Sequence, residues 1–140
     1  MHNEIQYSVC GHLQQEELGK LLLSAANSCY SANELESIIS NSTAYITARD
    51  ADKLVGFGRM LSDGAVVAYI NNMAVNPEYQ RQGIGQAILD RLIKTIGNVK
   101  SIFLYSNTAD LFYLHSGFQL SEKRLYMRQH REIIGSNPEK

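Results

Sequence analysis

The sequence predicts an α/β fold in which a mixed, strongly twisted central sheet carries helices on both faces. Three observations lead to this prediction. Residues 5–9 alternate polar and apolar side chains as a strand does, and the apolar residues that follow recur at helical spacing. Residues 43–61 have the pattern of an antiparallel hairpin. Residues 66–105 have the pattern of a strand, a helix and a second strand, and such a crossover joins parallel strands.

The composition is that of one ordinary globular domain. The chain has 140 residues, of which 44% are hydrophobic and 19% are charged. A net charge of -1 provides no overall positive field for nucleic acid or an anionic membrane. The first residues lack a basic stretch typical of secretion signals, and no apolar run nears the ~18 residues of a membrane span. We therefore expect a cytoplasmic protein with no nucleic-acid or membrane partner, built as one domain over residues 1–130 with a mobile tail over 131–140.

Two helices are expected between the first strand and the hairpin. The first is predicted from apolar residues that share one helical face, namely Leu18, Leu21, Leu22 and Ala25. Ser31 followed by Glu34 is a capping-box pattern, which predicts the start of a second, short helix through Ile38 and Ile39. Both helices then precede the hairpin, whose expected strands cover residues 43–48 and 54–61 with a polar interruption at 49–53.

The cysteines and histidines indicate no metal centre. Cys10 and Cys29 form no CxxC motif and have no histidine at ligand spacing, so we expect two buried thiols rather than a disulfide or a zinc site. The four histidines are scattered along the chain. We therefore expect no metal site.

The strand expected at residues 65–75 contains a polar interruption at Asn71 and Asn72. Two adjacent asparagines are costly inside a ladder unless the ladder opens there, so a β-bulge is predicted. The two side chains either satisfy the bulge or contact a substrate. After this strand, Asn76-Pro77 predicts a turn and a helix is expected from about residue 83, ended by Gly97-Asn98.

The last third of the chain is expected to finish the sheet. Residues 101–105 are almost continuously apolar, which predicts a strand buried on both faces. Asn107 or Thr108 can cap a short helix that runs through Leu114. A final hairpin is predicted from Gly117 to about Arg128.

The segment Gln80-Arg81-Gln82-Gly83-Ile84-Gly85 lies where a strand leads into a helix. Backbone N–H groups at a helix start lack partners and the helix dipole favours negative charge there, so the segment suits a phosphate. The alternative is a tight turn that needs glycine for its conformation alone. Two other phosphate motifs do not fit. Ile88 stands where a dinucleotide fingerprint has its third glycine, and no Lys-Ser or Lys-Thr pair follows as in a Walker loop.

This segment resembles the Q/R-x-x-G-x-G/A motif of the GCN5-related N-acetyltransferases. Two further motifs occur in the family's order: residues 72–77 resemble its bulged fourth strand, and Asn107 with residues 113–118 resembles its Y-x-x-x-G-F segment. The resemblance covers about residues 44–120 and is vague over the first forty. It implies a coenzyme A site and the acetyltransferase fold.

The resemblance assigns the cofactor contacts residue by residue. It implies that backbone N–H groups hold the diphosphate of acetyl-CoA, with charge added by the Arg81 side chain. The residues of this loop are Arg81, Gln82, Gly83, Ile84, Gly85 and Gln86. It also implies that Met73, Ala74 and Val75 bond the pantetheine arm as an added strand, with one N–H stabilising the oxyanion at the thioester carbonyl.

Side chains near residue 113 carry the chemistry that the resemblance implies. Tyr113 is the expected general acid, which protonates the departing thiolate, against the alternative of a tyrosine that only packs on its helix. Asn107 is expected to contact the pantetheine, to cap a helix, or both. Phe112 either flanks the cofactor or packs in the core.

The base that deprotonates the acceptor amine is not evident. Several relatives carry a glutamate on the fourth strand where this chain has Tyr69, so a water relay reaching Tyr69, Asp63 or an acid of the first half is the hypothesis. Charge is also uneven along the chain. Residues 1–76 contain four Lys/Arg and eight Asp/Glu, whereas residues 77–140 contain nine and six. An acidic half that attracts a cationic acceptor would complement a basic half that holds an anionic donor.

The expected activity is transfer of an acetyl group from acetyl-CoA to a primary amine by direct attack in a ternary complex. Within the family the chain looks most like the arylalkylamine-type enzymes, which predicts a small-molecule acceptor. The alternatives are acetylation of peptide or protein N-termini or lysines, a noncatalytic acyl-CoA-binding module, and a generic nucleotide binder. Relatives often dimerise, so a homodimer is compatible with the resemblance. The acceptor itself cannot be derived from these residues.

Overall fold

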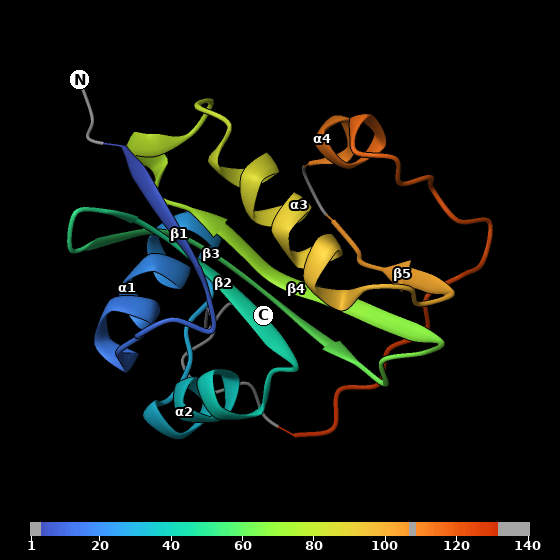
Figure 1. Ribbon diagram of the computed structural model, residues 1–140. Helices are drawn as coiled ribbons and strands as arrows, with labels where there is room; N and C mark the ends of the chain where they lie inside the picture. Colours follow the sequence, from blue (N-terminus) through green and yellow to red (C-terminus); the bar gives the residue numbers. More distant parts are fainter. Residues whose placement is uncertain (1–3, 107–108, 132–140) are drawn as a thin grey trace.

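The computed structural model describes residues 4–106 and 109–131 and contains one five-stranded sheet. The strands lie in chain order, β1-β2-β3-β4-β5, and all neighbours are antiparallel except β4 and β5 (Figure 1). In order, the elements are β1 (Ile5–Val9), α1 (Gln15–Ala26), α2 (Ala32–Asn41), β2 (Ala44–Asp50), β3 (Lys53–Ser62), β4 (Val67–Val75), the 3-10 turn η1 (Pro77–Tyr79), α3 (Ile84–Ile96), β5 (Ser101–Phe103) and α4 (Asp110–His115).

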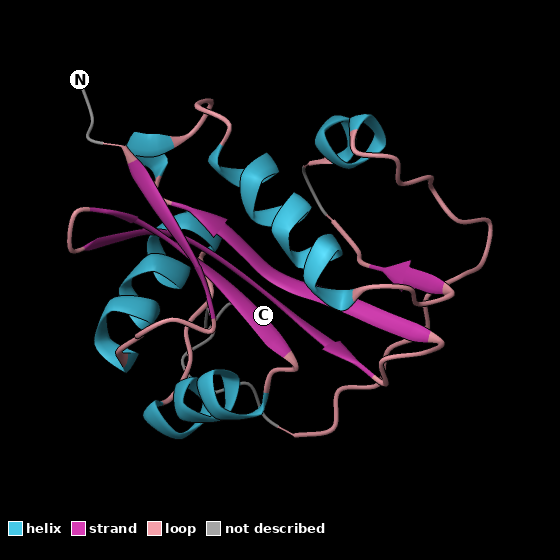
Figure 2. Cartoon of the chain, in the orientation of Figure 1, coloured by secondary structure: helices cyan, strands magenta, loops and turns pink. Residues whose placement is uncertain are grey.

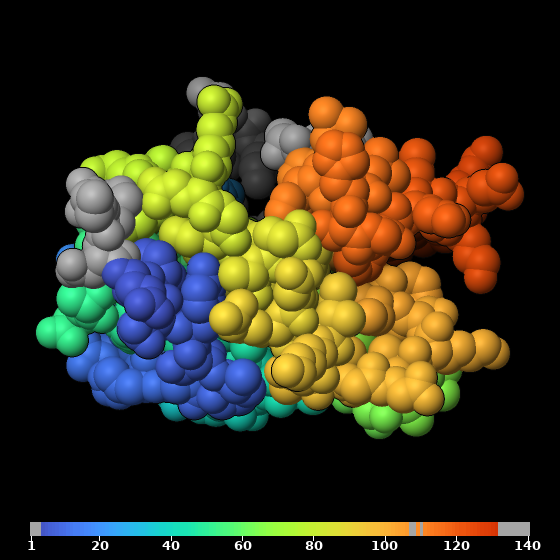
Figure 3. Space-filling model, turned by 45° about the horizontal axis from the view of Figure 1, so that its top comes forward, coloured from blue at the N-terminus to red at the C-terminus, as the bar shows by residue number. Residues whose placement is uncertain are grey.

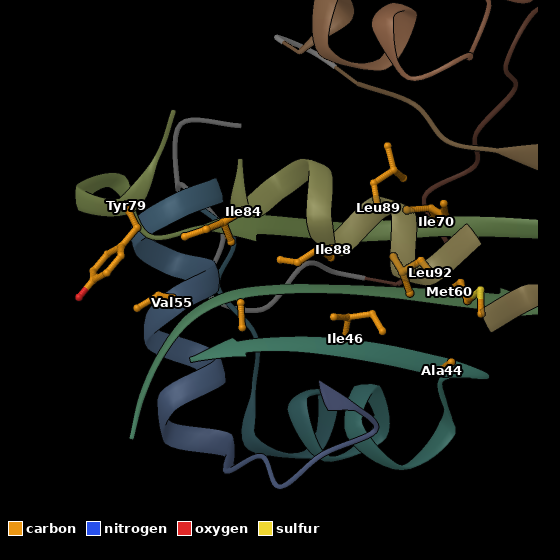
Figure 4. Packing of buried hydrophobic residues seen from close by; sticks show 11 residues of the cluster. Ala44, Ile46, Val55, Met60, Ile70, Tyr79, Ile84, Ile88, Leu89 and Leu92 are labelled. Carbon is orange, nitrogen blue, oxygen red and sulfur yellow. The ribbon is translucent and has the colours of Figure 1, made fainter. Parts of the chain in front are cut away.

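Helices cover both faces of the sheet, which confirms the predicted fold class (Figure 2). On one face α3 packs its apolar side against the strands, and Ile84, Ile88 and Leu92 are buried there (Figure 4). On the other face α1 and α2 bury Leu18, Leu22 and other residues around Phe57. The apolar stripe of each helix is thus removed from water by the sheet, and this burial is the main favourable contribution to folding.

The first two helices begin as the sequence predicts. At α2 the Glu34 amide donates to the Ser31 hydroxyl at 3.1 Å, and the Ser31 amide donates to the Glu34 carboxylate at 2.9 Å. This reciprocal capping box satisfies amides that the helix itself cannot. At α1, the Gln14 amide donates to Glu17 at 3.0 Å.

The β2–β3 hairpin is longer than predicted. Polar residues 49–53 were expected to interrupt it, but the ladder continues through Arg49 and Asp50, and only Ala51 and Asp52 form the turn. Arg49 is held by an ion pair to Glu17 of α1 at 2.6 Å. Because its charge is satisfied there, the strand does not need to end where the polar residues begin.

The predicted strand at residues 101–105 is shorter and more exposed than expected. β5 ends at Phe103, and it is the edge strand of the sheet. Half of the Phe103 surface and 63% of that of Tyr105 remain exposed, so the expectation of burial on both faces is wrong. A continuous apolar run does not distinguish a central strand from an edge strand, since only the neighbours decide how much is covered.

Three further expectations need correction or fall outside the described chain. Described residues 116–131 contain no strand, so the predicted final hairpin does not form; the segment instead reaches α2, where Arg131 binds Glu34 at 2.8 Å. An alternating pattern needs a paired edge to become a strand, and Leu120 stays 91% exposed. Cys10 and Cys29 are exposed free thiols, because each lies in a surface connection and not in the core. The capping residues predicted for α4 and the tail after 131 lie outside the described residues.

None of the helices in the described part of the chain is long and apolar enough to cross a membrane.

Candidate functional site

The predicted bulge is present in β4. Phe57 of β3 faces Ala74 and Arg59 faces Asn71, so Gly58 alone opposes both Asn72 and Met73. Asn72 takes the left-handed conformation with φ of 56°, which asparagine tolerates better than most residues. A Cβ on Gly58 would lie 2.5 Å from the Met73 sulfur, so glycine is needed for Met73 to fold back over β3.

Asn72 is held by three hydrogen bonds. Its backbone N–H donates to the Asn71 side-chain oxygen at 2.8 Å, its side-chain Oδ1 accepts from Arg59 Nε at 2.8 Å, and its Nδ2 donates to the Tyr30 hydroxyl at 2.9 Å. The two asparagines therefore satisfy the bulge, as one of the two interpretations predicts. Tyr30 and Arg59 were missed by the sequence reasoning; a lone arginine within the apolar run 54–61 was the available signal.

Beyond the bulge, no strand of residues 4–106 or 109–131 lies beside β4 on its β5 side. The parallel ladder joins Val67 to Ser101 and Tyr69 to Phe103 and then ends, while β4 continues to Val75. The predicted contact residues Met73, Ala74 and Val75 therefore lie where the two parallel strands have separated. A strand edge of this kind can accept an extended, strand-like ligand. The Val75 carbonyl accepts a hydrogen bond from Gln80 Nε2 at 3.1 Å, which links this edge to the following loop.

The loop before α3 presents backbone N–H groups to solvent. Arg81 and Gly83 have positive φ, 64° and 84°, and no side chain caps the helix, which begins at Ile84. Open space surrounds Gly83, with no heavy atom within 4 Å of the position of a Cβ. The first turn of α3 carries no acidic residue, whereas those of α1 and α2 do. This combination fits an anionic group such as a diphosphate, with the exposed Arg81 close to it in the chain.

Helix α4 lies against this same corner. The Phe112 ring is 3.6 Å from the position of a Cβ on Gly85, and a Val75 methyl is 3.8 Å from that position. The Ser116 hydroxyl donates to the Gln86 side-chain oxygen at 2.9 Å. Phe112 thus packs beside the core, as one of its two interpretations predicts. In Figure 3 the yellow-green loop before α3 and the orange α4 stand on two sides of a recess.

Tyr113 is half-buried between two aromatic rings. Its ring meets Phe112 edge-on at 4.9 Å and Phe118 at 5.9 Å between centroids. Burial raises the pKa of its hydroxyl above the ordinary value of 10. The phenol is therefore protonated at neutral pH, as a proton donor must be. The hydroxyl makes no hydrogen bond to residues 4–106 or 109–131, so the proton is available to a ligand.

Neither Tyr69 nor Asp63, the two residues named for the proton relay, is suited to act as a base. Burial raises the pKa of Tyr69 well above its usual range, and Tyr105, stacked 6.0 Å away, adds to this effect. Asp63 Oδ1 accepts the backbone N–H groups of residues 65–67 at 2.7 to 3.2 Å, which lowers its pKa. Asp63 therefore closes the β3–β4 turn, whereas Tyr69 remains a candidate only for relaying a proton through water.

Most of the predicted site residues converge at one corner of the sheet. Residues 73–75 supply the open strand edge, residues 81–86 supply the uncapped helix start, and Phe112 of α4 packs beside Gly85 with Tyr113 next to it. Asn107 lies outside the described residues. In the described part of the chain no group of three His, Cys, Asp or Glu side chains could hold a metal ion.

Comparisons with known proteins give the family. The model of the acetyltransferase (GNAT) domain matches residues 40–120. The GCN5-related N-acetyltransferase 2 of Arabidopsis thaliana, named as chloroplastic, is 34% identical over 110 residues, which are 70% of this chain and 42% of that protein. A histone acetyltransferase of Glycine max is 39% identical over 72 residues, 48% of this chain and 30% of that protein. The chain thus spans less than half the length of these curated relatives.

A solved structure resembles the whole fold. A Staphylococcus aureus protein of unknown function, named a probable acetyltransferase, superposes with a TM-score of 0.82 at 26% identity and covers 90% of this chain and 100% of its own. The family model matches more than half of the chain, and the described parts of the motif segments come close at one corner of the sheet, where Val75 lies near Gly85 and Ser116 binds Gln86. The chain therefore belongs to the GNAT acetyltransferases, the GCN5-related N-acetyltransferase family.

Proposed function

We propose that this domain transfers an acetyl group from acetyl-CoA to a primary amine by direct attack in a ternary complex. The observation that carries the proposal is that Phe112 of α4 and Val75 of β4 both lie within 4 Å of the position of a Cβ on Gly85, which brings α4 and the open β4 edge to the α3 N-terminus. An anion-binding loop, a strand edge for an extended arm and a protonated phenol are then adjacent. These are the three features that acyl transfer from a long anionic thioester requires.

Each part of the donor has a proposed partner. The N–H groups of residues 81–86 hold the diphosphate, and the backbone of residues 73–75 bonds the pantetheine arm. The bulge leaves Gly58 to oppose two residues, so an N–H of β4 can turn from the ladder to the thioester carbonyl. As the amine nitrogen bonds to the carbonyl carbon, the carbon–sulfur bond breaks and Tyr113 gives its proton to the leaving sulfur. The proton that the nitrogen loses passes to water and restores the Tyr113 phenol. Acetyl-CoA supplies the activated acyl group; Asn107 is proposed as a further pantetheine contact.

The acceptor is proposed to be a small amine of the arylalkylamine kind. Support comes from the hydrogen bond between Tyr30 and Asn72, which brings the α1–α2 connection against the bulge. This leaves less room for a large acceptor to reach the bulge. Three tyrosines, Tyr30, Tyr69 and Tyr105, lie on this side of the sheet or near it. The second candidate is a protein lysine or N-terminus, favoured by the name of the Glycine max relative.

The decisive experiment measures thiol release from acetyl-CoA across small amines, polyamines, amino acids and peptides. Release with at least one amine supports the enzyme. Tight binding of CoA without release would indicate a noncatalytic acyl-CoA-binding module, and tighter binding of ATP or NAD than of CoA would indicate a nucleotide binder. Sedimentation of the same sample tests the proposed homodimer.

Two broader expectations accompany this function. One catalytic domain over residues 1–130 is proposed, with residues 131–140 as a tail. A cytoplasmic location is proposed from the sequence, and the chloroplastic name of the Arabidopsis relative supports a plastid as the alternative. Localisation of the tagged full-length protein separates the two.

A further inference from the structure

Arg59 is a half-buried cation that has only neutral partners. It lies on β3, and its Nε donates to Asn72 Oδ1 at 2.8 Å while its Nη1 is 3.5 Å from the Ser42 hydroxyl. Among residues 4–106 and 109–131 no carboxylate forms an ion pair with it, and its Nη2 donates to none of their acceptors. The edge of the guanidinium formed by Nη1 and Nη2 is therefore almost unused.

Arg49, a second half-buried arginine, has a carboxylate partner and serves as the comparison. Arg49 binds Glu17 at 2.6 and 2.9 Å, and these bonds raise its pKa. For Arg59 the pKa is lowered instead, first because burial removes water from the charge. The nearby C-terminus of α2 contributes only a fraction of a negative charge. A buried charge without a counter-ion is costly, so a ligand that supplies an anion would be strongly favoured.

The surroundings of Arg59 are open to a ligand and lie next to the reacting centre. Tyr30, Tyr69, Asn71 and Asn72 are all half-buried, so the cluster keeps access to solvent. Asn71 faces Arg59 across the ladder, and Asn72, which Arg59 binds directly, precedes Met73. Tyr30 lies in the connection between α1 and α2, and Ser42 directly follows α2. Helix α3 packs on the opposite face of the sheet. A diphosphate held at the loop that leads into α3 would therefore lie away from Arg59 and would not neutralise its charge.

We propose that the Nη1–Nη2 edge of Arg59 binds a carboxylate of the acceptor, so that the acceptor is a small primary amine that also carries a carboxylate, as an amino acid does. The inference rests on the proposed acetyl transfer at the same site. A guanidinium edge matches the two oxygens of a carboxylate. Because Arg59 reaches the bulge through Asn72, a carboxylate held there leaves the amine of a short molecule beside residue 73. An internal lysine of a protein offers no carboxylate at that distance.

The test compares amines that differ only in the carboxylate. Phenylalanine with phenethylamine, and tyrosine with tyramine, are assayed by thiol release from acetyl-CoA. We expect kcat/KM to be at least about tenfold higher for each amino acid in the wild-type protein. Arg59→Gln should bring that ratio to about one, and Arg59→Lys should leave an intermediate ratio. Arg49→Gln, at an arginine of similar burial that already has a carboxylate partner, should keep the wild-type ratio. A wild-type ratio of one or less overturns the proposal.

A binding measurement keeps the inference separate from turnover. Calorimetry follows N-acetylphenylalanine and N-acetylphenethylamine binding to the CoA-loaded protein. N-acetylphenylalanine should bind more tightly than N-acetylphenethylamine, and Arg59→Gln should weaken its binding by at least about tenfold. This result supports the carboxylate site even if no amine is acetylated. A lack of acetylation would remove only the proposed function. Equal affinity for the two compounds overturns the carboxylate site even if amines are acetylated. Binding of CoA reports whether each variant folds. If Arg59→Gln does not fold, the comparison of the two compounds in the wild-type protein still tests the proposal.

Discussion

Tyr113 shows how surroundings adapt one side chain to a task. A tyrosine in water is already protonated at neutral pH, and the two aromatic neighbours at 4.9 and 5.9 Å make loss of its proton still harder. Burial therefore does not strengthen the acid. It fixes the ring in place and keeps the proton on it to a higher pH than for a tyrosine in water.

Tyr113→Phe should lower kcat by roughly a hundredfold or more, the usual size of a general-acid contribution, with a much smaller effect on the affinity for CoA. Because burial raises the pKa of Tyr113 above 10, its ionisation should cause little loss of kcat below about pH 9. Steady-state rates from pH 6 to 10 and calorimetry with CoA measure both quantities. Tyr126→Phe, at an exposed tyrosine, is the control. Equal losses of kcat and CoA affinity in Tyr113→Phe would contradict an acid role.

At the scale of elements, the two ends of α3 differ in what their glycines do. Gly83 and Gly97 both have positive φ, 84° and 76°, and both have open space where a Cβ would be placed. Gly83 has ψ of 5°, where an alanine meets left-handed strain of about 1 kcal/mol, whereas Gly97 has ψ of -141°, a combination that residues with a Cβ rarely adopt and that costs more. Only the N-terminal glycine lies in the loop proposed to hold the diphosphate.

Gly83→Ala should therefore destabilise the fold by about 1 kcal/mol in urea unfolding, and Gly97→Ala by at least as much. Only Gly83→Ala should also weaken CoA binding, by roughly tenfold, since the strain displaces N–H groups that contact the diphosphate. Calorimetry with CoA on both variants measures this. Equal weakening by the two substitutions would show that α3 stability, and not the loop, controls binding.

The contact between α1 and β2 is also a testable element. A hydrogen bond from Arg49 is the main reason that the pKa of Glu17 lies below its usual value. The folded state thus prefers the charged carboxylate, and its stabilising effect is present above pH 4.5 and lost as the pH falls through the lowered pKa. Glu17→Gln should cost about 1 kcal/mol at pH 7 and less at pH 3. Urea unfolding at both pH values measures this, with exposed Glu16→Gln as control; equal costs for both variants at pH 7 would contradict it.

The sequence predicted well those elements whose signals are local. The capping box at Ser31, the bulge at Asn71 and Asn72, and the glycine that ends α3 all depend on neighbours within a few residues. Expectations that depend on distant contacts were less accurate. The exposure of β5 and the missing hairpin after Gly117 depend on which strand lies alongside, and the role of Arg59 depends on Asn72 and on the α1–α2 connection.

At the scale of the whole molecule, charge is distributed unevenly between the halves of the chain. Residues 1–76 have a net charge of -4, from four basic and eight acidic residues, and residues 77–140 have +3, from nine and six. Part of this excess acidic charge is neutralised by the other half of the chain, since Glu34 binds Arg131. The remaining field would act on ligands before they reach the site.

If this field attracts cationic acceptors, added salt should lower kcat/KM more for a cationic amine than for a neutral one. Measuring the slope of log kcat/KM against log ionic strength from about 0.02 to 0.5 M tests this, because screening removes interactions beyond the Debye length. An aromatic amine that is neutral at the assay pH is the control. Equal slopes for the two acceptors would remove the steering effect.

The fit of the Met73 sulfur over Gly58 has a consequence for how this protein can change over generations. A Cβ at position 58 would fall 2.5 Å from that sulfur and 2.9 Å from a methyl of Ile88. Descendants of this chain that carry a larger residue at 58 must therefore displace both neighbours, of which the flexible Met73 side chain can move and the buried Ile88 cannot move easily. Position 58 should covary among homologues with position 88 as well as with position 73.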